Sequence, residues 1–345
     1  MDNNQPFISL VVPVRNESAY ILKTLEAILA QDYPSQRMEV LVADGMSDDG
    51  TREMVAEFAA DHSNIHLVDN PKRIVPTGLN TAILKAGGDV IVRMDSHSVY
   101  PANYLTTLVT ALRTYDCHNV GCLIETKPAD QSLAAKAIAV ALSHPFGVGN
   151  AWFRIGTNEV KEVDTVPFGC FRREVFDKIG LFDEELVRNQ DDEFNARMIK
   201  NGLKIVLIPN LVVSYYARAT YGKLFKMYYQ YGLFKPLVNL KLKRIATVRQ
   251  LVPALLVGYL LSTLLLGLFF PFAWLFFVSG ALIYLAGLTV VGLGARPINE
   301  PVAIAGHIVW AMATLHVSYG WGYLKGIVSL LFRHRLAKTG NSTSR

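Results

Sequence analysis

The sequence contains few cysteines and no evident secretory signal. Three of its 345 residues are cysteines, an odd number that includes no Cys-x-x-Cys pair. This usage argues against a disulfide framework and favours a reducing compartment. The N-terminal residues Met1–Gln5 lack a basic segment followed by an apolar one. We therefore expect the first half of the chain to stay in the cytosol.

Acidic residues are almost absent from the second half of the chain. Residues 1–193 carry 28 acidic and 17 basic residues, a net charge of −11. Residues 194–345 carry 17 basic residues and one acid, Glu300, a net charge of +16. A basic half suits phosphates, an anionic membrane surface or nucleic acid. Because long apolar runs accompany the basic residues, we favour the membrane and expect no nucleic-acid partner.

Charge is absent altogether from Gln250 to Ala295. This span is long enough for two membrane helices of about 20 residues each, and Pro271 marks the expected turn between them. A third apolar segment, Pro301–Leu324, contains His307 and His316. These histidines either pack between helices or line a lipid site, and we favour the first interpretation.

The third apolar segment leaves the topology open. Two spans return the chain to the cytosol near Arg296, so that a third span places the basic residues that follow it outside, against the positive-inside tendency. These basic residues are Arg333, Arg335 and Lys338. A re-entrant third segment, broken near Gly320 and Gly322, removes this conflict.

Residues 1–217 contain alternating strand and helix patterns. We expect buried strands at Phe7–Val12, Met38–Ala43, Ile65–Val68, Val90–Val92, Val163–Phe168 and Lys204–Ile208. Helices are expected at Ser18–Ala30, Gly50–Asp61, Thr77–Ala86 and from Asn189 to a stop near Gly202. This order is typical of βαβ units and predicts a parallel sheet with helices on both faces. Ligands of such sheets bind beyond the carboxyl ends of the strands.

Polar clusters follow three of these strands, at residues 13–17, at residues 44–51 and at Asp95 with His97. One such cluster alone is explained by turn and cap chemistry, but three at one edge favour a ligand crevice. Asp95 and His97 point to the same side if the strand continues. A carboxylate and an imidazole can hold a divalent cation whose other positions are filled by phosphate oxygens. The alternative is an Asp95 that caps the next turn and a solvated His97.

A second candidate lies at the start of the helix near residue 190. Phe194 and Met198 are i, i+4 partners that should face the core, and Asp191 falls on the same side. Asp192 and Glu193 turn away, and Glu193 can pair with Arg197 at i+4. Asp191 is a candidate catalytic base, and the alternative is an N-terminal acid favoured by the helix dipole.

A basic and aromatic segment separates the first half from the apolar runs. Residues 218–249 combine lysines with tyrosines, phenylalanines and leucines, a mixture that suits a helix in the headgroup region. We expect Arg218, Lys223 and Lys226 to face lipid or an acceptor substrate held at the membrane surface. A basic helix on an ordinary solvated surface is the alternative. The predicted organisation is a catalytic domain at 1–217, this interfacial segment, a transmembrane region at 250–332 and a polar basic tail at 333–345.

Five motifs, in order, resemble the family-2 glycosyltransferases of the GT-A fold, most closely the membrane-anchored members of the succinoglycan exopolysaccharide type. The first is Val12-Pro13-Val14-Arg15-Asn16-Glu17, and the second is Ala43-Asp44-Gly45-x-Ser47-x-Asp49-Gly50-Thr51. The others are Arg93-x-Asp95-Ser96-His97, Phe168-Gly169-Cys170-Phe171-Arg172-Arg173 and Gln190-Asp191-Asp192-Glu193. The resemblance covers most of the chain and implies an α/β fold, with a GT-A (Rossmann-like) nucleotide-sugar domain and C-terminal membrane helices.

The resemblance also implies roles for individual residues. Residues that border the donor nucleotide sugar would be Pro13, Arg15, Glu17, Asp44, Asp49, Asn80, Arg93 and Asp95, with Asp44 on the base. Asp95 and His97 occupy the metal motif, and the histidine in place of a second carboxylate favours Mn²⁺ over Mg²⁺. Asp191 inherits the role of general base, although Gln190 departs from the usual Glu-Asp pair.

The predicted activity is inverting transfer of one hexose from a nucleotide sugar to a polyprenyl-diphosphate-linked saccharide. A UDP-sugar is the expected donor, and exopolysaccharide or another cell-surface glycan is the expected product. The Gln-x-x-Arg-Trp motif of processive synthases is absent, which favours one sugar per encounter. The predicted location is the inner (cytoplasmic) membrane of a bacterial cell. We expect a multi-pass protein with a cytosolic catalytic domain, and a homo-oligomer is possible. Two alternatives are a polyprenyl-phosphate hexose synthase and a non-catalytic membrane scaffold with a vestigial nucleotide fold.

Overall fold

The computed structural model describes residues 5–96, 98–245 and 248–332. The chain divides into two compact units, one comprising Met1–Glu125 with Gly156–Tyr215 and the other Thr126–Ile155 with Tyr216–Arg345. The expected boundary after residue 217 lies beside the observed one. Residues 126–155, which the sequence assigns to the catalytic domain, belong to the second unit, because helix α5 (Leu133–Leu142) packs against the C-terminal helix α13 (Ala303–Leu331). The tail at 333–345 lies outside the described residues.

A mixed sheet forms the centre of the first unit. Its first four strands are parallel, in the order β3 (Ile65–Asp69), β2 (Met38–Asp44), β1 (Ile8–Val14) and β4 (Val90–Arg93). The sheet continues through β8 (Cys170–Arg172), β6 (Asn119–Lys127), β9 (Ile205–Tyr216) and β5 (Ser98–Val99), and β7 (Lys161–Glu162) pairs with β9. The predicted parallel sheet is correct for the first four strands only, because β8 runs antiparallel to both β4 and β6.

The strand expected at Val163–Phe168 is wrong. Val163 and Val166 are buried, but Phe168 has a φ of 48°, a left-handed conformation that no strand residue adopts. The extended segment therefore begins only after Gly169, at Cys170, where β8 pairs with β4. The strand expected at Lys204–Ile208 is confirmed as the first part of β9.

Helices cover the sheet of the first unit. They are α1 (Ile21–Leu29), α2 (Thr51–Ala60), α3 (Val75–Lys85), α4 (Tyr104–Thr114), α8 (Glu174–Ile179) and α9 (Gln190–Lys200), with a 3-10 turn at Ser35–Arg37. Each amphipathic helix buries its apolar stripe; in α1 the buried residues Ile21, Leu25 and Ile28 recur at the helical spacing. The four helices expected from the sequence are confirmed within a few residues at each end.

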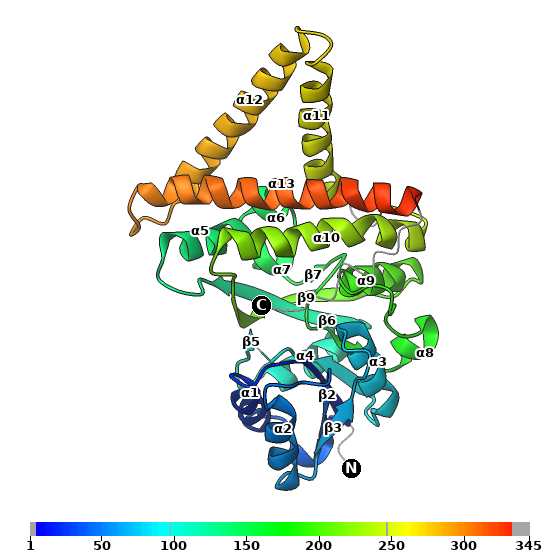
Figure 1. Ribbon diagram of the computed structural model, residues 1–345. Helices are drawn as coiled ribbons and strands as arrows, with labels where there is room; N and C mark the ends of the chain where they lie inside the picture. The colour runs from blue at the N-terminus through cyan, green and yellow to red at the C-terminus, as the bar shows by residue number, and fades with distance from the viewer. Residues whose placement is uncertain (1–4, 97, 246–247, 333–345) are drawn as a thin grey trace. The chain divides into compact units, whose positions relative to one another are not determined.

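The second unit is helical. It contains α5, the short helices α6 (Pro145–Val148) and α7 (Trp152–Ile155), α10 (Tyr221–Leu242), a 3-10 turn at Val248–Leu251, α11 (Val252–Leu266), α12 (Ala273–Gly294) and α13. Helices α10 and α13 lie side by side, and α11 and α12 form a hairpin (Figure 1). Two helical segments, Val248–Leu266 and Ala273–Gly294, are long and apolar enough to cross a membrane by length and composition.

Helix α13 is continuous, so the predicted break near Gly320 and Gly322 is wrong. These glycines instead allow close backbone packing: a Cβ at Gly322 would overlap the Tyr229 carbonyl of α10, and one at Gly320 would overlap the Pro253 carbonyl of α11. The two histidines of α13 pack between helices, as expected. His307 contacts the Tyr221 hydroxyl at 2.8 Å, and His316 contacts that of Tyr284 at 2.8 Å.

Candidate active site

The carboxyl ends of β1, β2 and β4 meet at one edge of the sheet. Val14 at the end of β1 lies beside Asp44 at the end of β2, and Val11 lies beside Arg93 at the end of β4. The segments that follow these strands carry most of the expected donor residues. They therefore emerge at the same edge, the usual ligand side of a sheet of this kind.

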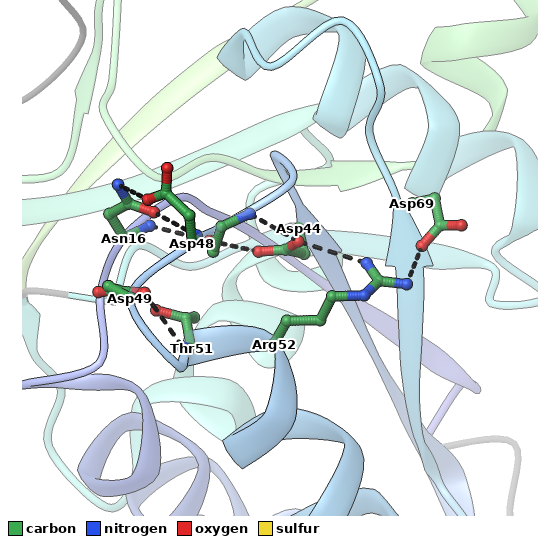
Figure 2. Close-up of polar contacts among 8 residues, drawn as sticks. Asn16, Asp44, Asp48, Asp49, Thr51, Arg52 and Asp69 are labelled. Carbon is green, nitrogen blue, oxygen red and sulfur yellow. Dashed lines mark hydrogen bonds and ion pairs between the residues drawn. The ribbon is translucent and has the colours of Figure 1, made fainter.

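The loops after β1 and β2 are joined by reciprocal hydrogen bonds (Figure 2). The side-chain amide of Asn16 donates to Asp48 Oδ1 at 2.9 Å, and the Asp48 N–H donates back to Asn16 Oδ1 at 3.1 Å. The Asn16 N–H also donates to Ser47 Oγ at 2.9 Å. Asn16 has a φ of 56°, which asparagine tolerates better than most residues. The two loops thus form one hydrogen-bonded border of the site.

Asp44 is fully buried beneath this border. Its carboxylate accepts hydrogen bonds from the Ser47 N–H at 3.1 Å and the Ser47 hydroxyl at 2.5 Å. Arg52 of α2 reaches Asp44 at 3.4 Å and Asp69, at the end of β3, at 2.6 Å (Figure 2). Asp44 therefore fixes the shape of the loop on which a nucleotide base would lie. Its contact with the base stays a prediction.

Asp49 holds the start of α2 against the loop after β1. Its carboxylate accepts hydrogen bonds from the Thr51 N–H at 3.0 Å, the Thr51 hydroxyl at 2.5 Å and the Ser18 N–H at 3.1 Å. Burial raises the pKa of Asp49, but the hydrogen bonds from Thr51 and Ser18 outweigh it and lower the pKa to about 2. Thr51 also accepts the Glu17 N–H at 2.8 Å. Thr51 ends the second motif of the sequence, which assigned it no role; its contacts with Asp49 and Glu17 depend on the fold.

Pro13, Arg15 and Glu17 lie along the same border. Pro13 is half-buried beside Ala43. Gly45 lets the Arg15 side chain lie across its backbone, since a Cβ at this position would be 3.2 Å from Arg15 Cβ and Cδ. Glu17 is 8% exposed, and its carbonyl accepts the N–H of Ile21 at the start of α1 at 2.9 Å. Their contacts with a donor stay predictions.

Asn80 of α3 holds the loop between α8 and α9. Its amide nitrogen donates to the Phe182 carbonyl at 2.9 Å, and its amide oxygen accepts the Phe182 N–H at 3.0 Å. Asn80 is 5% exposed and also reaches Glu184, which pairs with Lys72 at 2.5 Å. In this structure Asn80 therefore positions the loop that leads to α9.

Arg93 joins the two carboxylates that the sequence assigns to the metal and to the base. Its Nη1 donates to Asp191 Oδ1 at 2.5 Å, while Nε and Nη2 donate to the two oxygens of Asp95 at 3.1 and 3.4 Å. The Arg93 side chain is 10% exposed, against 17% for Asp95 and 37% for Asp191. One buried guanidinium therefore holds the end of β4 and the start of α9 together.

The surroundings of Asp191 raise the pKa of its carboxyl. Burial raises the pKa of its carboxyl, the nearby charge of Asp95 raises it further, and the Arg93 guanidinium partly opposes both. A base needs this combination, since a carboxylate with a raised pKa binds a proton more tightly and still remains accessible. Asp191 lies in the first turn of α9, where the helix dipole also favours a carboxylate. The two interpretations of Asp191 are thus compatible.

Helix α9 is fixed from three sides. The buried Asn195 accepts a hydrogen bond from the Asn119 amide of β6 at 3.0 Å and donates to Thr165 at 2.8 Å. Arg197 pairs with Glu193 at 2.8 Å, as expected, and donates to the carbonyls of Ile179 and Leu181, which frame the loop after α8.

One prediction for this helix is wrong. Glu193 does not turn away into solvent but is 5% exposed, because the ion pair with Arg197 neutralises it. Phe194 and Met198 are fully buried, as predicted. Phe194 packs among three other phenylalanines, namely Phe171, Phe176 and Phe182.

The Asp95 backbone is held by Tyr100, a residue without a sequence signal. The Tyr100 hydroxyl accepts the Asp95 N–H at 2.7 Å and donates to the Asp95 carbonyl at 3.3 Å. Burial and the adjacent Asp95 charge raise the pKa of Tyr100, so its hydroxyl stays protonated. Thr24 of α1 donates to the neighbouring Ser96 carbonyl at 2.7 Å. The end of β4 is thus fixed before any ligand binds.

The expected metal ligands are only partly visible, because His97 lies outside the described residues. Within 5–96, 98–245 and 248–332, no three His, Cys, Asp or Glu side chains form a metal-binding group. A cation held mostly by diphosphate oxygens requires only one or two protein carboxylates. Asp95, with two oxygens near the strand end and partial exposure, fits that requirement.

The expected acceptor or lipid contacts lie in the second unit. Arg218 is half-buried just before α10, and Lys223 and Lys226 are exposed on α10. Leu224 and Met227, on the other side of this helix, are buried in the helical core. Helix α10 therefore presents Lys223 and Lys226 outward, whereas Lys235, farther along the same helix, is buried at 1% exposure.

Comparisons with known proteins agree with this geometry. A family profile described as "Glycosyl transferase family 2" matches residues 9–180, which include Arg93 and Asp95. The succinoglycan biosynthesis protein ExoA of Rhizobium meliloti is 31% identical over 246 residues, 71% of this chain and 73% of that protein. A second relative, from Methanococcus voltae, is 28% identical over 339 residues, 93% of this chain and 97% of that protein. It is a dolichyl N-acetyl-alpha-D-glucosaminyl phosphate 3-beta-D-2,3-diacetamido-2,3-dideoxy-beta-D-glucuronosyltransferase.

The fold has a solved counterpart as well. The mannosyltransferase PcManGT from Pyrobaculum calidifontis, solved in complex with GDP-Man and Mn²⁺, aligns with a TM-score of 0.55 and 18% identity. The alignment covers 95% of this chain and 88% of that protein, so the expected GT-A-like α/β fold is confirmed. With the matched profile and the identity to the succinoglycan protein, the chain belongs to glycosyltransferase family 2, whose members transfer a sugar from a nucleotide sugar with inversion.

Proposed function

We propose that this enzyme transfers a single hexose from a nucleotide sugar, a UDP-sugar being the first choice, to a saccharide linked to a polyprenyl diphosphate at the cytosolic membrane face. The observation that carries the proposal is the guanidinium of Arg93, which contacts both Asp95 and Asp191. A donor diphosphate near Asp95 and an acceptor hydroxyl near Asp191 would then lie within one side chain's reach. Inverting transfer requires the leaving group and the base on opposite sides of the anomeric carbon, and Asp95 and Asp191 are the two groups that would serve these sides.

In this mechanism Asp191 accepts the proton of the acceptor hydroxyl as that oxygen attacks the anomeric carbon, and the bond from this carbon to the diphosphate oxygen breaks, so that the nucleoside diphosphate leaves with the electron pair. Arg93 orients the carboxylate through its Nη1 contact, and its positive charge lowers the pKa of Asp191 against the effect of burial. The loops held by Asp44 and Asp49 form the border for the nucleotide. Asn80 keeps the loop before α9 in place.

Asp95, and by sequence His97, would hold a divalent cation, Mn²⁺ before Mg²⁺. An oxygen ligand and an imidazole suit Mn²⁺, and PcManGT was solved with that ion. When bound, such an ion neutralises charge that develops on the leaving nucleotide. Tyr100 and Thr24 keep the Asp95 segment in position whether or not the ligand is present.

The acceptor assignment is supported by the relatives and by charge. The Methanococcus relative is named for a dolichyl-phosphate-linked sugar, and the Rhizobium relative for succinoglycan biosynthesis. Arg218, Lys223 and Lys226 would contact the diphosphate of the lipid or anionic headgroups. A bacterial cytoplasmic membrane, with the product used for exopolysaccharide or another surface glycan, is the corresponding location.

The test is donor-dependent nucleotide release in the presence of total polyprenyl-linked lipids, comparing Asp191→Asn with Asp192→Asn. The two variants remove the same charge from adjacent positions, so only loss of the base should matter. We expect Asp191→Asn to lower the rate of transfer by about 10²- to 10⁴-fold with little change in donor affinity measured by calorimetry. Equal rates for the two variants would refute the role of Asp191.

The same assay separates the alternatives. If the acceptor is the lipid phosphate itself, the phosphate oxygen needs little help from a base, and Asp191→Asn should cost far less. Phosphatase treatment of the acceptor should then abolish the activity. Donor binding without release under every condition would instead indicate a non-catalytic scaffold.

A further inference from the structure

The hairpin α11–α12 has an apolar tip. From Leu264 to Ala273 the sequence contains no charged residue and no polar side chain. The side chains at the turn are nevertheless strongly exposed, with Leu268 at 70%, Phe269 at 76% and Phe272 at 67%. A turn that emerges into water on the far side of a membrane is ordinarily polar. The exposed side chains of this turn are all apolar.

The turn also satisfies most of its own backbone N–H groups. Hydrogen bonds within the turn engage the N–H groups of Gly267, Leu268, Phe269, Phe270, Ala273, Trp274 and Leu275. Pro271 has no N–H to donate, and the Trp274 indole donates to the Gly267 carbonyl at 3.1 Å. Water would satisfy such groups at no cost, but hydrocarbon cannot. Most N–H groups of the turn therefore have the internal bonds that a lipid environment favours.

The hydroxyl groups of the hairpin follow the same rule. Every hydroxyl side chain from Leu251 to Ala295 is hydrogen-bonded within the second unit; they are Tyr259, Ser262, Thr263, Ser279, Tyr284 and Thr289. Tyr259 of α11 donates across the hairpin to the Phe276 carbonyl of α12 at 2.7 Å. Polar side chains inside a bilayer are expected to be bonded in this way.

Both ends of the hairpin are fixed to one segment. Arg249, just before α11, donates to Asn150 Oδ1 at 2.5 Å. Glu300, just after α12, pairs with Lys136 of α5 at 2.7 Å, and its carbonyl accepts a hydrogen bond from Arg296 at 2.7 Å. Asn150 and Lys136 lie in residues 126–155, which no membrane-spanning segment separates from the catalytic strands. Both ends of the hairpin thus share the cytosolic side, as the flanking arginines also favour.

We propose that α11–α12 is a re-entrant anchor whose tip ends inside the hydrocarbon of the bilayer. The occupant of its exposed surface is lipid acyl chain, and no loop reaches the far side. Helix α13 then lies along the near interface, packed on α10 and α5, with Trp310 and Trp321 exposed on its outer face. The enzyme is monotopic, in contrast to the multi-pass arrangement that the apolar runs suggest. This inference is independent of the transfer reaction.

The test is thiol accessibility of the full chain in right-side-out and inverted membrane vesicles. Cys117, Cys122 and Cys170 are buried, so the unmodified protein gives the background. Phe269→Cys reports the tip, and Ile298→Cys, at a position 92% exposed between α12 and α13, is the matched control. Vesicles are treated with a membrane-impermeant maleimide. Remaining thiols are then counted in detergent by mass shift.

We expect Ile298→Cys to react only in inverted vesicles and Phe269→Cys to react in neither, because a thiol in hydrocarbon does not ionise. Reaction of Phe269→Cys in right-side-out vesicles would mean two full spans and would overturn the proposal. Reaction only in inverted vesicles would mean that the hairpin lies outside the bilayer, and would overturn it equally.

A second variant keeps the test independent of labelling. Phe269→Lys places a charge at the tip, which hydrocarbon rejects and water on the far side would accept. We expect the fraction of Phe269→Lys that resists a carbonate wash of the membranes to fall, while Phe269→Leu matches the unmodified protein. An unchanged membrane fraction for Phe269→Lys would contradict a tip within the bilayer.

Discussion

Replacing Arg93 by lysine tests whether one guanidinium couples the two carboxylates of the site. Arg93 uses Nη1 for Asp191 and Nε with Nη2 for Asp95, so its planar fork serves both partners at once. A lysine ammonium is a single point and cannot keep this geometry on both sides. We expect Arg93→Lys to fold, because it retains the positive charge between two acids, but to leave Asp191 less well oriented.

The magnitude follows from the lost contact. A hydrogen bond to a charged group contributes about 1.5–3 kcal/mol. Because the Asp191 side chain is 37% exposed, water replaces part of the contact, and we take the lower end of that range. At about 1.4 kcal/mol per factor of ten, kcat should fall about tenfold in Arg93→Lys. Loss of the Asp191 contact should not by itself change the donor KM, since Asp191 is not expected to touch the donor.

The pH dependence gives a second readout. A base works only when deprotonated, so kcat falls as the pH drops through the pKa of Asp191. The charge of Arg93 lowers that pKa against the effects of burial and of Asp95. Arg93→Gln removes the charge, and its acid limb should therefore move to higher pH, whereas Arg93→Lys should move it less.

The assay is initial-rate nucleotide release as a function of donor concentration and pH. Arg172→Lys is the control, because Arg172 also makes several contacts, to Asp116 and to the carbonyls of Leu112 and Cys117. It lies opposite Val90, at the other end of β4. A raised donor KM with kcat and the acid limb unchanged in Arg93→Lys would refute the coupling and place Arg93 on the donor alone.

Three further outcomes are expected. Gly322→Ala should destabilise the detergent-solubilised protein by about 1–3 kcal/mol, because the new Cβ overlaps the α10 backbone. Gly306→Ala, with open space around it, should be neutral or stabilising, and thermal unfolding of both variants measures the difference. Asn80→Ala should cost about 1–3 kcal/mol and speed proteolysis between residues 180 and 189, since the Phe182 backbone loses both partners; an unchanged cleavage rate would contradict this role. Chelation by EDTA should abolish nucleotide release and added Mn²⁺ should restore it; full activity after chelation would exclude a metal-dependent reaction.

Patterns over a few residues predicted the helices and strands well where one apolar face of the element packs on the core. The stripe of α1, the ends of β1 and β2, and the pairing of Glu193 with Arg197 all depend on spacings of a few residues. Phe168 shows the limit of such patterns. Its neighbours are apolar enough for a strand, yet a left-handed turn at this residue places β8 after it.

Contacts between distant segments could not be predicted from periodicity. Arg93 and Asp191 are 98 residues apart, and Asn80 and Phe182 are 102 apart. The motif around Asp95 assigned both Arg93 and Asp95 to the donor, a prediction that stays open, but it gave no indication that Arg93 also contacts Asp191. Tyr100 had no signal at all, since its hydroxyl acts on the Asp95 backbone, whose position only the fold determines.

The loops around the site are held by contacts that do not involve the Arg93 side chain. The Arg93 variants should therefore change the orientation of the carboxylates and not the order of these loops. Four non-glycine residues with positive φ border the expected functional residues: Asn16, Met46, Phe168 and Asn189. Such conformations persist only where the surroundings fix them. Here Asn16 is bonded to Asp48, and the Phe168 carbonyl accepts the Tyr104 hydroxyl at 3.3 Å. None of these restraints involves the Arg93 side chain, so Arg93→Lys should leave the loops in place and reorient only the carboxylates.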